Sequence, residues 1–198
     1  MSDPHTPAAP RRRADAERSI ARILDAAVDS LSANPEASMG DIARRAGVVR
    51  ATVYVHFPTR ELLIEAITHR AIAEVSEVIA SAEPDAGDPV QALRRVVSAA
   101  WQTLGRYHAL VAINAGVAHE EHHHRHASAL AALEPLVDRG QKARVFRPDV
   151  PAAWHLATLL ALIHTASVEL GSGRIAEEAV EAALLASVVG AVTADAVH

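Results

Sequence analysis

The amino-acid sequence predicts an all-α protein. Half of its 198 residues are hydrophobic, mainly alanine, valine and leucine, and only 3% are aromatic. Alanine and leucine favour helices, and no long alternation of β-branched residues competes with them. In addition, residues 38–60 predict two short helices around a glycine turn, followed by the start of another helix. We therefore expect about nine helices, with a three-helix helix-turn-helix unit near the N-terminus.

The composition excludes several classes of protein. With no cysteine, the chain has neither disulfides nor thiolate metal sites. No hydrophobic signal peptide and no uninterrupted run of eighteen apolar residues is present, so we expect a cytoplasmic protein with no membrane partner. The net charge is −5, but residues 1–70 carry ten basic and nine acidic side chains. The acidic excess therefore lies in residues 71–198, and the more basic part of the chain contains the helix-turn-helix.

The first expected helix runs from about Asp15 to Ser32 and ends at Asn34-Pro35. Residues 1–14 contain three prolines and no apolar periodicity, so they predict a flexible arm. Two readings of its basic run stay open, a contact with a nucleic-acid backbone or a solvated cluster of charge. The run consists of Arg11, Arg12 and Arg13.

The helix-turn-helix is predicted from its helix ends. Ser38 and Asp41 have the spacing of a capping box, and Gly47 suits the left-handed turn that ends a helix. The second helix is expected over residues 49–57, because Pro58 cannot continue it. Three residues spaced by four are expected to pack inward: Val49, Val53 and Phe57.

The outer residues of this second helix suit DNA. An arginine can bond a guanine edge, and Ala51 or the Thr52 methyl can contact a thymine methyl. Tyrosine and histidine can reach phosphate oxygens, as can an arginine in the first turn of the helix after Thr59. The alternative is a small helical module whose exposed residues bind nothing. The candidate DNA contacts are Ser38, Arg50, Ala51, Thr52, Tyr54, His56 and Arg60.

Residues 42–63, IARRAGVVRATVYVHFPTRELL, resemble the DNA-binding domain of TetR-family transcriptional regulators. The resemblance implies an all-helical homodimer, with a DNA-binding domain over residues 15–60 and a ligand-binding and dimerisation domain over 61–198. It also implies that Arg50, Ala51 and Thr52 face bases, and that Tyr54, His56 and Arg60 hold phosphates. Two residues depart from the family pattern. Val49 lacks the usual capping side chain, a loss of about 1 kcal/mol, and Val55 replaces a polar residue.

The remaining helices follow from apolar spacing and from two proline-containing breaks, residues 83–89 and 147–151. A connecting helix over 59–82 would join the DNA-binding end to the rest. A proline at position 135 is expected to kink the helix that contains it. The helices expected after the connecting one are a segment ending near 105, then 106–123, 127–139, 152–170 and 175–196.

The last two helices are apolar on more than one side, so each must bury more than one side. Small residues on the final helix would let another helix approach closely: Ala183, Ala186, Ser187 and Gly190. We therefore expect a homodimer in which these helices and their copies form a four-helix bundle. The alternative is that both are central core helices of a monomer.

A helical domain with mixed apolar and polar inner residues can hold a small ligand. Aromatic and histidine side chains would supply large faces with one polar group each. Each candidate taken singly also fits an ordinary core or surface position. The candidates are Trp101, Leu104, Tyr107, His108, Val111, Asn114, Trp154, His155, Thr158, Leu159 and His164.

A histidine-rich run at residues 119–126 offers an alternative effector, a metal ion. Four histidines there share one helix face, and neutral imidazoles at that spacing can bind zinc, nickel or copper. A solvated helix end and a pH-responsive surface are the other interpretations. The four residues are His119, His122, His123 and His126.

An enzyme is not predicted, because the chain has no nucleophile elbow and no His-Glu-x-x-His motif. No cofactor is predicted either. A helical interaction protein that has lost DNA binding stays as a further alternative. The favoured hypothesis is a ligand-responsive repressor that a small-molecule effector releases from double-stranded operator DNA.

Overall fold

The computed structural model describes residues 8–113 and 125–194. Within these ranges the protein is built from helices and turns, with one isolated β-bridge between Phe146 and Thr193. The all-α expectation is therefore confirmed. The chain divides into two compact units, Met1–Ile67 and Thr68–His198, and the division falls inside a helix.

Unit 1 contains the helix-turn-helix. Its first helix begins before the expected Asp15, with Pro10 in the first turn, where a helix N–H has no helical partner to lose. Part of the expected arm is thus helical. Residues 1–7 lie outside the described residues, and the side chains of the arginines at 11–13 are not described. The helices are α1 (Ala8–Ala33), α2 (Met39–Ala46), α3 (Arg50–His56) and the start of α4 (Arg60–Ser81).

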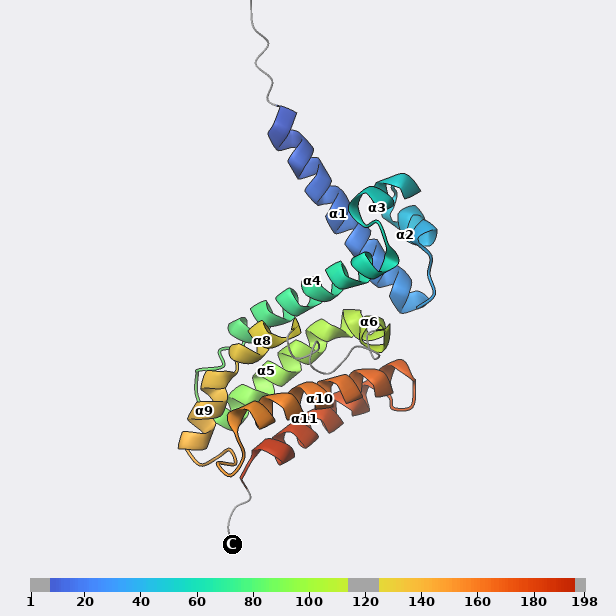
Figure 1. Ribbon diagram of the computed structural model, residues 1–198. Helices are drawn as coiled ribbons and strands as arrows, with labels where there is room; N and C mark the ends of the chain where they lie inside the picture. Colours follow the sequence, from blue (N-terminus) through green and yellow to red (C-terminus); the bar gives the residue numbers. More distant parts are fainter. Residues whose placement is uncertain (1–7, 114–124, 195–198) are drawn as a thin grey trace, which may run out of the picture. The chain divides into compact units, whose positions relative to one another are not determined.

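The core of unit 1 joins all four helices. Helix α2 lies between its two partners, packing against α1 and against α3 (Figure 1). Ile23, Leu24, Ala27 and Leu31 of α1 are buried in this core. The largest fully buried side chains of the unit are Ile23 of α1, Ile42 of α2, Val53 of α3, and Leu63 and Ile67 of α4.

Unit 2 begins at Thr68, inside α4, and contains the remaining helices, which form a bundle. Asp88 caps its next helix by accepting the Gln91 N–H at 2.9 Å, with Pro89 in the first turn. The helices are α5 (Pro89–Leu104), a 3₁₀ turn (Gly105–Tyr107), α6 (His108–Ile113), α8 (Ala127–Ala131), α9 (Glu134–Lys142), α10 (Ala152–Gly171) and α11 (Glu177–Val192).

Two helix bounds differ from expectation. The segment expected as one kinked helix over 127–139 is two helices, because Pro135 starts α9 instead of bending a continuous one. The last helix ends at Val192, where Thr193 adopts an extended backbone and pairs with Phe146, so it stops short of residue 196. Of the helix expected over 106–123, residues 114–123 lie outside the described part.

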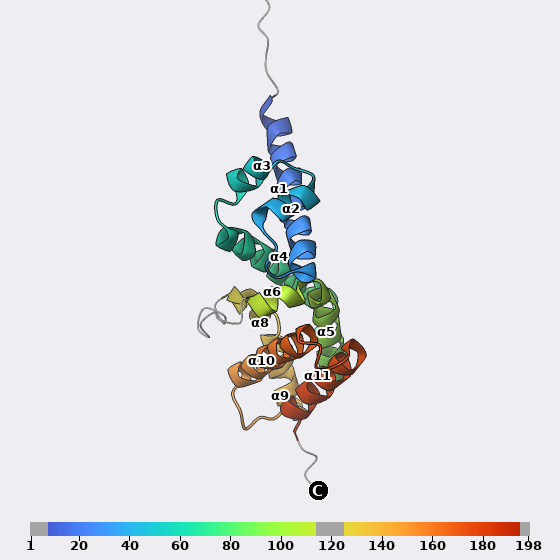
Figure 2. The same ribbon diagram turned by 90° about the vertical axis from the view of Figure 1, so that its right-hand side faces the viewer.

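Helices α10 and α11 form an antiparallel hairpin that packs on the rest of unit 2. α11 lies against α5, and α10 contacts α6 and α9 (Figure 2). One core cluster joins these helices with α4, and its largest buried members include Trp101, Leu136, Phe146 and Val188. The bundle leaves space between α4 and α10, which forms the pocket described below.

Candidate nucleic-acid interface and ligand pocket

The helix-turn-helix begins with a closed capping box on α2. The Ser38 Oγ accepts the Asp41 backbone N–H at 3.2 Å, and Asp41 Oδ2 accepts the Ser38 backbone N–H at 3.0 Å. The Ser38 hydroxyl also donates to the same carboxylate at 2.7 Å, and this hydrogen bond holds the pKa of Asp41 below its usual value. The expected cap is confirmed, and it already occupies the hydroxyl that was a candidate DNA contact.

The turn between α2 and α3 depends on a left-handed glycine. Gly47 has a φ of 65°, and its N–H closes the end of α2 on the carbonyl of Arg44. From α1, Arg22 Nη2 donates to the carbonyls of Ala46 at 2.6 Å and Gly47 at 3.1 Å. These bonds tie the end of α2 to α1 and thereby set where α3 begins.

Helix α3 is anchored by Val53 and Phe57, which are buried as expected. Val49 does not join them, since its side chain is 70% exposed. It occupies the N-cap position in an extended conformation, so its side chain does not follow the helical spacing of the other two. The cap also lacks a side-chain hydrogen bond, as expected for valine.

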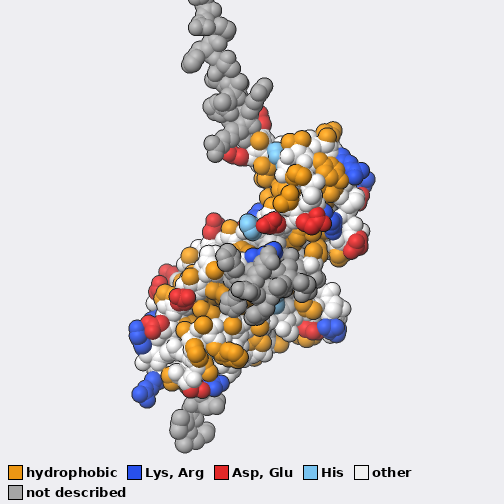
Figure 3. All heavy atoms as spheres, in the orientation of Figure 1, with side chains coloured by type: hydrophobic (Ala, Val, Ile, Leu, Met, Phe, Trp, Pro, Cys, Tyr) orange, Lys and Arg blue, Asp and Glu red, His pale blue; other side chains and the backbone are white. Residues whose placement is uncertain are grey.

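The outer face of α3 brings Arg50 and Tyr54 together. Arg50 Nη2 donates to the Tyr54 hydroxyl at 3.1 Å, and the guanidinium carbon lies 5.3 Å from the ring centroid. This hydrogen bond raises the pKa of Arg50. Ala51 and Tyr54 are exposed, Thr52 and His56 are half-buried, and Val55 is 77% exposed. Figure 3 shows Arg side chains at the surface of unit 1 beside α2 and α3, where the sequence has no lysine.

Arg60, a candidate phosphate contact, donates to backbone carbonyls in this structure. Its Nη1 donates to the carbonyl of Ala37, and its Nη2 donates to that of Pro35. The side chain is half-buried, and the helix N-terminus is capped instead by Thr59, whose Oγ1 accepts the Leu62 N–H at 3.3 Å. Sequence reasoning missed this role because Pro35 and Ala37 are distant in the chain.

We expect Arg60→Ala to lower the free energy of unfolding by about 2 kcal/mol, because a partly buried charged donor leaves two carbonyls unpaired. Urea denaturation followed by circular dichroism measures this change. The matched control is Arg44→Ala, since Arg44 forms only an exposed pair with Asp41 and should change stability by less than about 1 kcal/mol. Equal stability of the two variants would contradict the structural role of Arg60.

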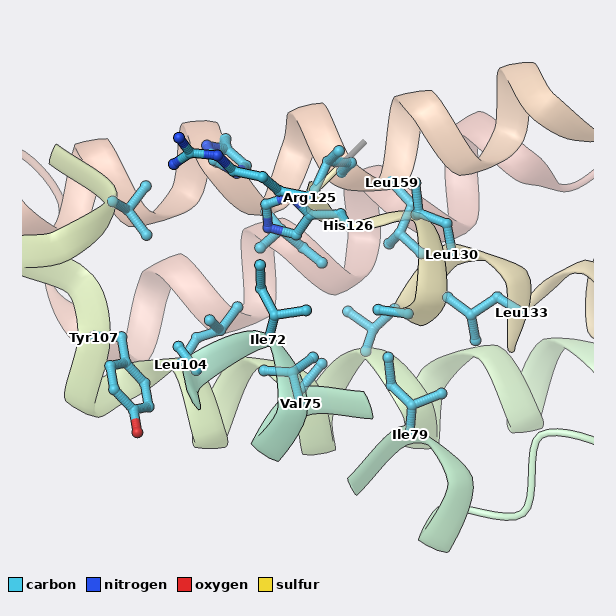
Figure 4. A pocket seen from close by; sticks show the side chains of 18 of the residues that line it. Ile72, Val75, Ile79, Leu104, Tyr107, Arg125, His126, Leu130, Leu133 and Leu159 are labelled. Carbon is cyan, nitrogen blue, oxygen red and sulfur yellow. The ribbon is translucent and has the colours of Figure 1, made fainter. Parts of the chain in front are cut away.

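A pocket of about 100 Å³ lies inside unit 2, between α4, α5, α6, α8 and α10 (Figure 4). Most of its wall is aliphatic, and the α4 side is formed by residues from Thr68 to Ile79. One polar side chain at the wall, Thr68, belongs to α4, and the others come from other helices and from the residues just before α8. These others are Tyr107, Arg125, His126 and His164.

Part of the expected ligand set lines this pocket. Leu104, Tyr107, Val111, Leu159 and His164 are all on its wall. The contribution of α4 was not expected, although the apolar spacing of Ala71, Ile72, Val75 and Ile79 could have indicated an inward face. Asn114 lies outside the described residues.

The other expected ligand residues lie elsewhere, for different reasons. Trp101 is a core side chain and Trp154 is 65% exposed. His155 is buried with its Nε2 3.0 Å from the Arg147 carbonyl, which fixes the ring away from the pocket. Thr158 is half-buried and is not among the residues that line the pocket. His108 packs against the Trp101 ring at 5.1 Å, and desolvation lowers its pKa.

Tyr107 connects the pocket wall to α4. Its ring lines the pocket while its hydroxyl is directed away and donates to Glu74 Oε2 at 2.7 Å (Figure 4). Burial and this hydrogen bond raise the pKa of Tyr107. Glu74 also accepts from Arg70 Nε at 3.0 Å, so one carboxylate links the 3₁₀ turn to two turns of α4.

Most histidines of the hypothetical metal site lie outside the described residues. His119, His122 and His123 lie there, whereas the His126 ring packs edge-on against His164 with centroids 5.8 Å apart. Among residues 8–113 and 125–194, no group of three or more potential metal ligands is assembled.

The chain is similar in sequence to known transcriptional regulators. A family model described as "Bacterial regulatory proteins, tetR family" matches residues 23–67. The HTH-type transcriptional repressor LfrR of Mycolicibacterium smegmatis is 30% identical over 182 residues, covering 89% of this chain and 92% of LfrR. The HTH-type transcriptional regulator NfxB of Pseudomonas aeruginosa is 25% identical over 148 residues, covering 72% of this chain and 78% of NfxB.

The same relationship appears in the fold. The crystal structure of the TetR-like regulator LfrR from Mycobacterium smegmatis, in complex with proflavine, matches with a TM-score of 0.68 at 25% identity. The match covers 89% of this chain and 98% of that chain, so it includes both compact units.

Proposed function

Because the chain belongs to the TetR family of bacterial regulatory proteins, we propose that it is a cytoplasmic, homodimeric repressor that a small-molecule effector releases from operator DNA. As a member of this family it is a DNA-binding transcriptional regulator and not an enzyme. The observation that carries the proposal is α3, a helix anchored by two buried side chains whose outer face carries Arg50, Ala51 and Tyr54 in solvent.

Each outer residue of α3 has a proposed role in DNA recognition. Arg50 reads a guanine edge, while Ala51 and Thr52 contact neighbouring bases. Tyr54 and His56 position the helix on phosphates. Val55, at 77% exposure, is an aliphatic group suited to a thymine methyl. Ser38 and Arg60 support this surface indirectly, since one caps α2 and the other holds the loop before it.

The DNA-binding part is tested by electrophoretic mobility shift, with duplexes selected from random sequence by the wild-type protein. We expect Arg50→Ala to relax the preference at one base pair, losing about 1–3 kcal/mol of discrimination. Tyr54→Phe should weaken binding to all sequences alike. Because the Tyr54 hydroxyl accepts a hydrogen bond from Arg50, the double variant should lose less than the sum of the two.

The control for this experiment is Arg94→Gln, which removes an exposed positive charge from α5 and should leave DNA binding unchanged. Affinity for the selected duplex should fall steeply with salt, because phosphate contacts release counterions. If both α3 variants bind the selected duplex as the wild type does, α3 is not the reading helix.

The proposed dimer forms through α10 and α11. Small side chains stand exposed along α11, at Ala182, Ala183, Ala186, Ser187 and Gly190. In Figure 3, hydrophobic side chains gather at the surface over the start of α10, the region of the exposed Trp154. An apolar face without a partner in the chain is what a two-fold interface requires.

The composition of α10 fits the same proposal. By length and composition Ala152–Gly171 could cross a membrane, and 28% of its most apolar window is buried within the chain. We propose that the second copy covers much of the remaining apolar surface, in a four-helix bundle. A helix buried on two sides in this way is apolar without entering a membrane.

The effector is proposed to bind in the pocket of unit 2. One wall of that pocket is α4, a continuous helix from Arg60 to Ser81 whose first turns belong to unit 1. A ligand that binds one position of α4 better than another would therefore shift the DNA-binding helices between two states.

A further inference from the structure

The pocket combines an apolar body with one polar end. Sixteen of the twenty-one described residues that line it are alanine, valine, leucine or isoleucine. The polar end consists of Arg125, His126 and His164, which come from the residues before α8 and from α10. Figure 4 shows Arg125 and His126 on the side of the pocket away from Val75 and Ile79. A ligand that fills this space needs an apolar body and a polar group at one end.

The charge at the wall has one sign. Of the lining residues within the described ranges, none is Asp or Glu, whereas Arg125 carries a permanent positive charge. Glu74 does not line the pocket; its carboxylate accepts hydrogen bonds from the Tyr107 hydroxyl and from Arg70. A cation in this pocket would lose its hydration without gaining a carboxylate from the described wall, and it would be repelled by the Arg125 guanidinium.

An anion would find the opposite situation. A guanidinium has five N–H donors in a planar fork that matches a carboxylate, so Arg125 can bind a ligand anion beside the contacts it makes within the chain. The imidazoles of His126 and His164, whose centroids lie 5.8 Å apart, can add ring N–H donors at the same end.

We infer that the effector is an apolar molecule with a single anionic head group, the head at Arg125 and the body along the aliphatic wall of α4. This inference rests on the proposal that the pocket is the effector site, and it adds the chemical class of the effector. Cationic ligands such as the dye proflavine should accordingly bind this chain weakly.

Three probes with one body and three head groups test the inference. Decanoate and decylammonium, each below its micelle concentration, and decanol, below its solubility limit, are titrated into the full-length protein by isothermal titration calorimetry. We expect decanoate to bind most tightly and decylammonium most weakly. Arg125→Gln should weaken decanoate binding by about tenfold or more, leave decanol within about twofold, and improve decylammonium binding.

Two variants separate charge from structure. Arg125→Lys should keep much of the decanoate preference because it keeps the charge, and the surface variant Arg94→Gln should change no probe. The inference is overturned if decylammonium binds the wild type as tightly as decanoate, or if Arg125→Gln weakens all three probes equally. If none of the probes binds, the proposal that this pocket is the effector site fails as well. If decanol binds and releases DNA, the pocket is still the effector site, whatever head group it prefers.

Discussion

Replacing Gly190 by leucine is expected to convert the protein into monomers and to lower its operator affinity by about 100-fold or more. Apart from the neighbouring residues and local backbone of α11, no described atom lies within 4 Å of the position of a Cβ at Gly190, so the leucine fits within the chain itself. It would instead protrude from the small-residue face of α11 and hold a second copy away. A monomer engages one half-site at a time and loses the gain in effective concentration that links the two.

Light scattering measures the mass, and mobility shift measures the affinity. Ala143→Leu serves as the control, because it adds the same type of side chain to an exposed position after α9 and should leave the protein dimeric. A Gly190→Leu protein with the mass of a dimer and wild-type affinity would show that α11 does not form the interface.

The second large effect is expected inside unit 2, at Gly140. A Cβ there would lie 2.0 Å from Phe146 Cδ2, and the Phe146 ring is completely buried. The backbone cannot simply shift, because the Gly140 carbonyl accepts the N–H groups of Val145 and Phe146 at 3.1 and 3.0 Å. We expect Gly140→Ala to destabilise the protein by about 2–3 kcal/mol, despite the better helix propensity of alanine.

Urea denaturation of Gly140→Ala beside Gly171→Ala measures this effect. The second glycine has no atom within 4 Å of its Cβ position, so its substitution should be neutral or slightly stabilising. In a Phe146→Leu background, Gly140→Ala should cost less than it does alone, since a smaller side chain relieves the overlap. Equal effects in both backgrounds would exclude the contact with Phe146 as the cause.

Much of the helix-turn-helix was predictable because its signals are local. The capping box of Ser38 and Asp41, the left-handed Gly47 and the proline after Phe57 act within a few residues of chain, and each has its expected role. The prediction for Val49 was wrong because the spacing of helical residues does not extend into the extended N-cap position.

The pocket was predictable only in part. Leu104, Tyr107 and Leu159 were expected from their own helices, but nothing in the sequence placed α4 opposite them. Trp154 and His155 were expected to line it because they are large and amphipathic. Residue type alone does not show that the Trp154 side chain is exposed, or that His155 binds a backbone carbonyl, instead of contacting a ligand.

The sequence by itself determined the helical class, most helix ends and the residues offered by α3, because backbone preferences and capping hydrogen bonds act between near neighbours. Only the tertiary structure decided that Arg60 holds the carbonyls of Pro35 and Ala37, and that Arg125 lines the same pocket as the aliphatic side chains of α4. These contacts join residues more than twenty positions apart. Their geometry follows from how whole helices pack, and no local pattern encodes it.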